Sequence, residues 1–176
     1  MTIRVRSIGL IAVLCAGVIT VNLQWTAEAA DDNKACELVT ASEIASVLGA
    51  NVTLKGRDAM PGGKTQVCMG QAASGRLMLR LVTGLDPGRD RSGSKEKAGM
   101  EMLKQMGGQV EVRTFGPIVC STLEPPTDKQ QMGYNTTCTV NKDTAMAGIE
   151  FTANKKSDML PIDRVHGLAE KVAGRF

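Results

Sequence analysis

Apolar and polar residues alternate in several short segments of the chain, which is the period of strands buried on one face only. The pattern is clearest in residues 76–83 and 146–153. The apolar positions are Leu77, Leu79 and Leu81 in the first segment and Ala147, Ile149 and Phe151 in the second. Further strands are expected near residues 51–56, 65–71, 109–115, 117–123 and 134–141. Because these strands follow one another without helical crossovers, the pattern predicts one antiparallel sheet of six to seven strands.

Helical signals occur in three other segments, residues 41–48, 95–106 and 161–173. In the first, Thr40 is a suitable N-cap, Glu43 completes a capping box and Gly49 ends the helix. Pro161 opens the last helix and Gly174 follows it. The faces expected to be apolar are Ile44, Val47 and Leu48, then Gly99, Met102, Leu103 and Met106, and then Ile162, Val165, Ala169 and Val172.

The chain also contains a faint internal repeat of a helix followed by strands. Residues 43–55 align without a gap on residues 101–113, and residues 75–84 align on 145–154. The second copy is longer, so the alignment needs a gap, and chance similarity is the alternative explanation. The predicted fold class is α+β, with helices packed on an antiparallel sheet and a possible α-βββ repeat. The predicted units of the single domain, residues 30–176, are the copies 40–84 and 95–154 and the C-terminal helix 161–173.

Residues 1–29 have the three-part layout of a secretory signal peptide. Two arginines precede an apolar stretch, and Ala27 and Ala29 form an A-x-A cleavage pattern. We therefore expect cleavage after Ala29 and no membrane span in the mature chain. An uncleaved anchor is the alternative, because an apolar run of about 17 residues lies at the lower limit for a membrane-spanning helix. The bulky Leu14 before Cys15 argues against lipidation there.

The charge of the mature chain favours no particular class of partner. Removing residues 1–29 takes away two arginines and one glutamate, which lowers the formal net charge from +3 to +2. This bias is too small to predict nucleic acid or an acidic membrane as partner. The remaining aromatic residues, which are few for stacking on sugars or bases, are Phe115, Tyr134, Phe151 and Phe176.

Four cysteines remain after cleavage: Cys36, Cys68, Cys120 and Cys138. An even number behind a signal peptide predicts two disulfides and a periplasmic or secreted location. No C-x-x-C occurs, so neither a redox motif nor a zinc knuckle is indicated. Of the three pairings we favour Cys36–Cys68 and Cys120–Cys138. Cys120 and Cys138 fall on neighbouring strands of one hairpin, and Cys36 precedes the helix under which the strand of Cys68 is expected to pack.

The segment CELVTASEIASVLG, residues 36–49, resembles the opening of small secreted bacterial domains of unknown function. These domains begin Cys-x-Leu-Leu-Thr-x-x-Glu, close the motif with Leu-Gly, and carry a second cysteine a few tens of residues later, as Cys68 is here. FGPIVCS, residues 115–121, resembles a glycine-containing strand of that family. This chain departs from the family in lacking a convincing lipobox and in having Met69 where an aromatic residue is common. The resemblance implies an α+β envelope protein without a defined activity, so it assigns no catalytic residue.

Each candidate catalytic motif has a simpler structural explanation. Ser94 and Lys97 spell the S-x-x-K of serine acyl-enzymes, but no S-D-N or K-T-G element accompanies them, and Ser94 suits a helix N-cap. His166, the only histidine, lies beside an apolar helix face with no carboxylate spaced to orient it. MPGGKT, residues 60–65, has Asp58 where a phosphate-binding loop needs its first glycine. We therefore predict no catalytic, cofactor-binding or metal-binding residue.

Methionines offer a different chemistry, because thioethers are soft ligands for Cu(I). Met100, Met102 and Met106 form M-x-M-x-x-x-M. On a helix Met102 and Met106 share a face while Met100 projects about 160° away, so the three cannot meet on one ion. We interpret these methionines as pliable core residues.

The sequence thus predicts a non-enzymatic extracytoplasmic protein that binds a protein partner or a small ligand in the cell envelope, without nucleic acid. Two alternatives are an envelope hydrolase with an unrecognised site, to which Ser94 or His166 would contribute, and a methionine-based Cu(I) carrier. The residues do not identify the partner, the ligand or the oligomeric state.

Overall fold

The computed structural model describes residues 33–60, 64–86 and 94–176, with the side chains of 94–98 left out. The predicted cleavage site after Ala29 and the centre of the MPGGKT segment lie outside the described residues. Seven strands form one antiparallel sheet in the order β1-β2-β3-β7-β6-β5-β4. They are β1 (Leu54–Asp58), β2 (Thr65–Ala72), β3 (Gly75–Thr83), β4 (Gln109–Phe115), β5 (Ile118–Glu124), β6 (Tyr134–Lys142) and β7 (Ala145–Ala153).

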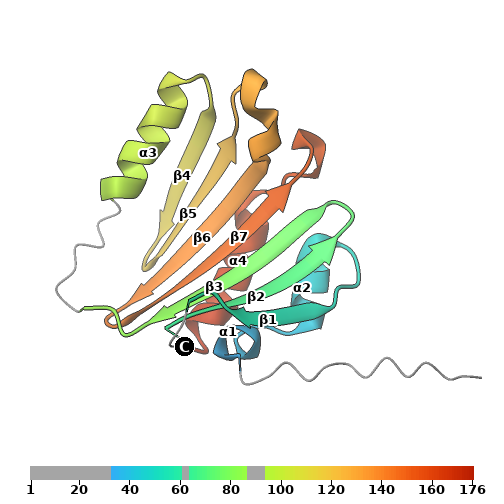
Figure 1. Ribbon diagram of the computed structural model, residues 1–176, viewed down its shortest axis with the longest axis vertical. Coiled ribbons are helices and arrows are strands. Elements are labelled where there is room, and N and C mark those ends of the chain that lie inside the picture. The colour runs from blue at the N-terminus through green and yellow to red at the C-terminus, as the bar shows by residue number, and fades with distance from the viewer. Residues whose placement is uncertain (1–32, 61–63, 87–93) are drawn as a thin grey trace, which may run out of the picture.

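Helices precede, interrupt and follow these strands (Figure 1). They are α1 (Lys34–Glu37), α2 (Ala41–Leu48), α3 (Ser94–Gln105) and α4 (Ile162–Ala173), with the short 3-10 helices η1 (Thr127–Met132) and η2 (Lys156–Asp158). The α+β class, the antiparallel sheet and the three main helices are therefore confirmed. The sequence pattern missed α1, which contains Cys36, and both 3-10 helices.

One face of the sheet carries the hydrophobic core. Side chains from α1, α2 and α4 pack there on alternate residues of the strands. The apolar faces expected of α2 and α4 are buried as predicted. The strand residues in this core include Leu77, Leu79, Ala147, Ile149 and Phe151. The period-2 pattern thus identified the buried positions correctly.

A single row of buried residues crosses this face and contains three of the four disulfide-bonded cysteines. Cys68 lies opposite Leu79, Leu79 opposite Ile149, Ile149 opposite Cys138, and Cys138 opposite Cys120. Cys120 and Cys138 are bonded to each other across β5 and β6, and Cys68 is bonded to Cys36 of α1. Both predicted disulfides are confirmed.

The central strand pair has an approximate two-fold relation. Leu79 and Ile149, which are equivalent in the sequence alignment of the two copies, lie directly opposite each other on β3 and β7. Cys68 and Cys138 occupy equivalent positions on the next strands outward. The helices do not follow this relation, because α2 packs in the core whereas Met100 and Leu103 of α3 lie against residues of the opposite face. The two-fold relation therefore holds for the strands and not for the helices, and the internal repeat stays a prediction from the sequence.

The expected apolar face of α3 is correct for Leu103 and wrong for its other three residues. Met102 is 63% exposed and Met106 is 42% exposed, and Gly99 is also exposed. Among the described side chains of α3, Met100 and Leu103 line a hollow against the sheet; they are three residues apart and so share a face. Interpretation of these methionines as core residues fails for Met102 and Met106.

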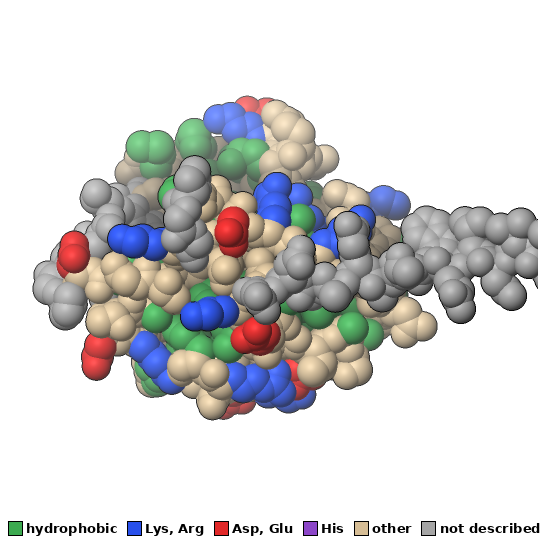
Figure 2. Space-filling view, turned by 60° about the horizontal axis from the view of Figure 1, so that its bottom comes forward, with side chains coloured by type: hydrophobic (Ala, Val, Ile, Leu, Met, Phe, Trp, Pro, Cys, Tyr) green, Lys and Arg blue, Asp and Glu red, His purple; other side chains and the backbone are tan. Residues whose placement is uncertain are grey.

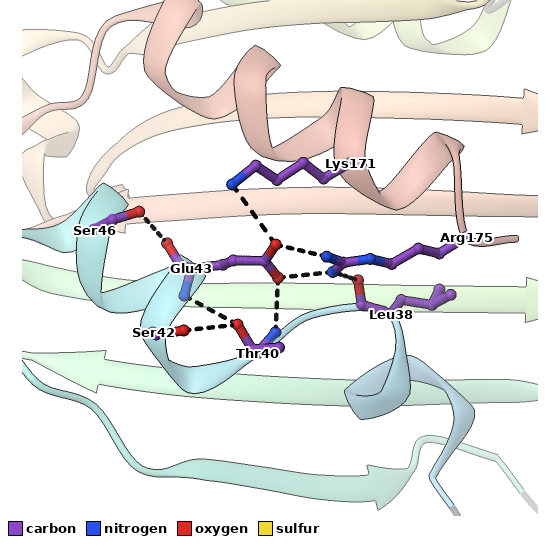
Figure 3. A network of polar contacts seen from close by, with 7 residues as sticks. All are labelled: Leu38, Thr40, Ser42, Glu43, Ser46, Lys171 and Arg175. Carbon is purple, nitrogen blue, oxygen red and sulfur yellow. Dashed lines mark hydrogen bonds and ion pairs between the residues drawn. The ribbon is translucent and has the colours of Figure 1, made fainter.

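The start of α2 is tied to the C-terminus through Glu43 (Figure 3). The capping box with Thr40 forms as predicted: Thr40 Oγ1 accepts from the Glu43 amide, and Glu43 Oε2 accepts from the Thr40 amide. Arg175, beyond the end of α4, binds both carboxylate oxygens at 2.6 and 2.7 Å and donates to the Leu38 carbonyl. Lys171 lies 3.6 Å from Oε1. The hydrogen bonds from Arg175, aided by those from Thr40 and opposed by partial burial, lower the pKa of Glu43 from 4.5 to about 2.

Replacing this carboxylate should weaken the fold in a pH-dependent way. We expect Glu43→Gln to reduce the free energy of unfolding by about 1–2 kcal/mol at pH 7, because it removes the charge-assisted bidentate pair with Arg175 while the amide oxygen still accepts from Thr40. The lowered pKa means that the contribution is complete above pH 4.5 and is lost as the pH falls toward 2. The measurement is urea unfolding at pH 7, 5, 4 and 3.

The matched control is Glu37→Gln, which removes an exposed carboxylate from α1. It should change the free energy of unfolding by less than about 0.5 kcal/mol at every pH. A Glu43→Gln effect that stayed constant down to pH 3 would contradict the assigned role of the charge.

The two disulfides should differ in their contribution to stability. Cys36 and Cys68 are 32 residues apart and Cys120 and Cys138 are 18 apart, so loop closure alone gives about 3.7 and 3.2 kcal/mol. The first disulfide also holds the four-residue α1 on the sheet, whereas the second joins strands that are already paired. We therefore expect Cys36→Ser/Cys68→Ser to lower the melting temperature more than Cys120→Ser/Cys138→Ser. Thermal unfolding followed by circular dichroism decides the order, and equal losses would refute it.

Candidate functional site

The face of the sheet opposite the core, called here the open face, is the candidate functional surface. In Figure 1, α2 and α4 lie behind the sheet and α3 stands beside β4. Polar side chains alternate on this face with exposed apolar ones such as Val112, 48% exposed, and Val119, 37% exposed. A Cβ added at Gly148, in the middle of central strand β7, would meet no atom within 4 Å. None of the described helices therefore covers the centre of this face.

A hollow lies where α3 meets the open face, and we call it the α3 hollow. Its lining residues are Met100, Leu103, Val110, Ser121, Thr122, Leu123, Asn135, Thr137 and Glu150. The volume is about 230 Å³, below the usual range of about 300–1,000 Å³ for small-molecule pockets. Four of these side chains are apolar, and the other five carry hydroxyl, amide or carboxylate groups. The hollow is thus suited to a small amphipathic group, such as a side chain of a partner protein.

The polar floor of the hollow is ordered by a short hydrogen bond. Thr152 Oγ1 donates to Asn135 Oδ1 at 2.7 Å and lies 3.3 Å from Glu150 Oε1. One hydroxyl proton serves only one acceptor, and the shorter contact goes to Asn135. The carboxylate of Glu150 therefore keeps accepting capacity for a donor group that enters the hollow.

Four basic side chains share the open face on the β1–β3 side. Register places Lys55 and Arg57 of β1 and Arg76 and Arg80 of β3 on this face, and all four are exposed. Figure 2, which views the molecule from another side, shows basic, acidic and apolar side chains intermingled over the visible surface. The register therefore gathers four cations on one half of the open face.

His166 has a more defined environment than its sequence context indicated. Its ring lies 4.0 Å from that of Phe115, and its Nδ1 is 3.9 Å from a carboxylate oxygen of Glu170. The expectation that no carboxylate is spaced to orient it was wrong, because the i, i+4 spacing on α4 brings Glu170 alongside. The described contacts of His166 include no serine or cysteine, so the residues needed for nucleophilic catalysis do not converge there.

The other candidate groups are also separated. Helix α3 begins at Ser94, but the side chains of Ser94 and Lys97 lie outside the described residues. Met100 lines the α3 hollow while Met102 is exposed, as their angular separation on the helix requires. The sequence analysis missed Met69 and Met78, which lie directly opposite each other on the open face. Lys55 lies opposite Met69, and Arg76 and Arg80 lie two residues on either side of Met78. The thioether pair is thus surrounded by cations, which disfavours Cu(I) binding.

Two glycines on the central strands test which face is bare. We expect Gly148→Ala to leave the free energy of unfolding unchanged or raise it by up to about 1 kcal/mol, because the added methyl group meets open space. The matched change Gly75→Ala, on the core face of β3, should lower it by about 2 kcal/mol or more. A Cβ there would overlap the Thr152 carbonyl and lie 2.9 Å from the Phe151 ring. Chemical denaturation of both variants measures the difference, and equal destabilisation would show that the open face is covered.

Comparisons of this chain with protein-family models, with curated proteins and with solved structures found no match. Within the described part of the chain, no helix is both long and apolar enough to cross a membrane. Nor do its histidine, cysteine and acidic side chains gather in groups of three or more that would hold a metal ion. The functional assignment therefore rests on the geometry of the open face.

Proposed function

We propose that this protein is a non-enzymatic binding protein of the periplasm or extracellular space, and that a partner protein contacts its open face. The observation that carries the proposal is the α3 hollow beside the exposed side chains of Val112 and Val119. An amphipathic hollow flanked by exposed apolar side chains has the mixed composition of a protein interface with an anchor site. In this proposal an apolar side chain of the partner enters between Met100 and Leu103 of α3 and the sheet.

Two features support an extracytoplasmic location. The disulfides Cys36–Cys68 and Cys120–Cys138 are compatible with an oxidising compartment. The N-terminal segment has the layout of a signal peptide, which remains a prediction from the sequence. Both features support the proposal that the binding surface lies in the cell envelope or outside the cell.

A small amphipathic ligand is the second candidate for the α3 hollow. Glu150 favours it, because its carboxylate lies in the lining with accepting capacity to spare. Such a ligand would place a donor on Glu150 and an apolar group against Leu103 and Val110. The volume of about 230 Å³ limits this ligand to a few heavy atoms inside the hollow, which is why a protein partner is preferred.

Site-specific photo-crosslinking in intact cells tests the proposal. A benzoylphenylalanine in place of Val112 on the open face should give a covalent adduct of one discrete mass. The same residue in place of Arg164, exposed on α4, should give none. Leu103→Trp, which fills the hollow, should lower the adduct yield about tenfold, the effect of losing an anchor contact of about 1.4 kcal/mol.

Met102→Trp is the matched control for the Leu103→Trp change. It adds the same indole to the same helix at a side chain that is 63% exposed, and it should leave the yield within about twofold. Equal adducts from Val112 and Arg164, or none from Val112, would refute the open face as the binding surface.

A further inference from the structure

The basic side chains Lys55, Arg57, Arg76 and Arg80, which we call the basic strip, form an ordered pattern on the open face. Arg57 and Arg80 flank Val67 from the two neighbouring strands, and Lys55 lies opposite Met69. Arg76 lies opposite Gln71, so the charges surround the centre of β2. With strands about 4.8 Å apart, the Arg57 and Arg80 backbones are about 10 Å apart across Val67.

The basic strip has no acidic partners among the described residues. The cations that do form ion pairs include Lys104, Arg113, Lys156, Lys171 and Arg175, none of which belongs to the basic strip. Among the described strands, only Glu150 places a carboxylate on the open face, opposite Met78. Four exposed cations against one carboxylate leave this half of the face strongly positive.

Protection of a sheet edge explains only part of this charge. Cations on an edge strand discourage pairing with other chains, which accounts for Lys55 and Arg57 on β1. Arg76 and Arg80 lie on β3, which is paired on both sides by β2 and β7. Protection of the sheet edge therefore does not explain the two arginines of β3.

The side chains between the cations decide what kind of anion fits. Val67 is 2% exposed, and Met69 and Met78 are half-buried, so the apolar groups are recessed between longer cationic side chains. A bilayer surface is bound by apolar side chains that protrude into it, and none protrudes here. No described aromatic side chain lies on this part of the face, so nucleic-acid bases have no stacking platform. A carboxylate-bearing chain with small apolar groups between its charges matches both features.

We propose that the basic strip binds an acidic polypeptide segment of the partner, laid across β1–β3 with its carboxylates on Arg57, Arg76 and Arg80 and its apolar side chains over Met69 and Met78. This inference rests on the proposed function, because the acidic segment belongs to the same partner that uses the α3 hollow. Guanidinium groups favour such a segment because they bind carboxylates with two hydrogen bonds each. The contact is electrostatic and therefore weakens as salt is added.

The probe is an acetylated and amidated peptide of four Glu-Val repeats with a fluorescent label, titrated against the full mature chain. We expect saturable binding that weakens with added NaCl and shifts the NMR signals of the Met69 and Met78 methyl groups.

Arg57→Glu/Arg80→Glu should weaken binding at least about tenfold. The control Lys155→Glu/Arg164→Glu makes the same change in net charge away from the open face and should stay within twofold. Because Arg57 and Arg80 cover Val67, the milder Lys55→Gln/Arg76→Gln provides a second variant, and circular dichroism verifies that each is folded.

Three results would overturn the proposal. The first is equal weakening by the control pair, and the second is equal affinity for a Gln-Val peptide. The third is preference of the same residues for phosphatidylglycerol vesicles or single-stranded DNA over the peptide. Leu103→Trp should leave peptide affinity unchanged, so the strip and the hollow are tested separately. If the peptide does not bind but Val112 still forms the crosslink, the acidic segment is refuted and the proposed function stands. If the peptide binds but Val112 forms no crosslink, the proposed partner site is refuted and the basic strip stands.

Discussion

The pairing of β3 with β7 is the constraint on which the rest of the structure depends. It joins strands that are 70 residues apart at Leu79 and Ile149, and each strand brings its own neighbours to the sheet. Because side chains alternate with a period of two, a slip of one residue would move every buried leucine of β3 to the opposite face relative to β7. The register therefore decides both where α1, α2 and α4 find an apolar surface and which face stays open. The disulfides reinforce this arrangement from its flanks, where Cys68 and Cys138 continue the row of Leu79 and Ile149.

Local signals in the sequence predicted the elements because their causes are local. Alternation located the strands, and the Thr40–Glu43 capping box with Gly49, whose φ is 70°, located α2. The disulfide Cys120–Cys138 followed from a hairpin, which is also a short-range feature. The order of strands was not predicted, since the β3–β7 pairing depends on a long-range choice that no turn specifies. Helix α1 was missed because four residues are too few for a periodic pattern, and its N-cap at Asn33 is recognisable only once the fold holds it.

The candidate site was much harder to predict than the fold. Polar residues at alternate positions of a strand look the same whether they face solvent or a partner, so Arg76 and Arg80 gave no signal until the register placed them beside Lys55 and Arg57. On α3 the hydrophobic pattern predicted Leu103 correctly but favoured Met102 and Met106 over Met100, which lines the hollow. Both sides of the helix are apolar, so the pattern alone does not decide between them. The proximity of Glu170 to His166 was the exception, because i, i+4 spacing on a helix makes it readable from the sequence.

The open face follows from the way in which the helices depart from the two-fold relation of the strands. If both copies were equivalent, a helix preceding β4 would cover the core face of β5–β7 as α2 covers that of β2 and β3. In this chain α4 occupies that place, and its buried Val165, Leu168 and Val172 supply the apolar surface. Helix α3 lies on the other side of the sheet, where it packs at β4 and lines the hollow beside Leu103. The C-terminal helix α4 thus completes the core, and α3 forms one wall of a surface that the core does not use.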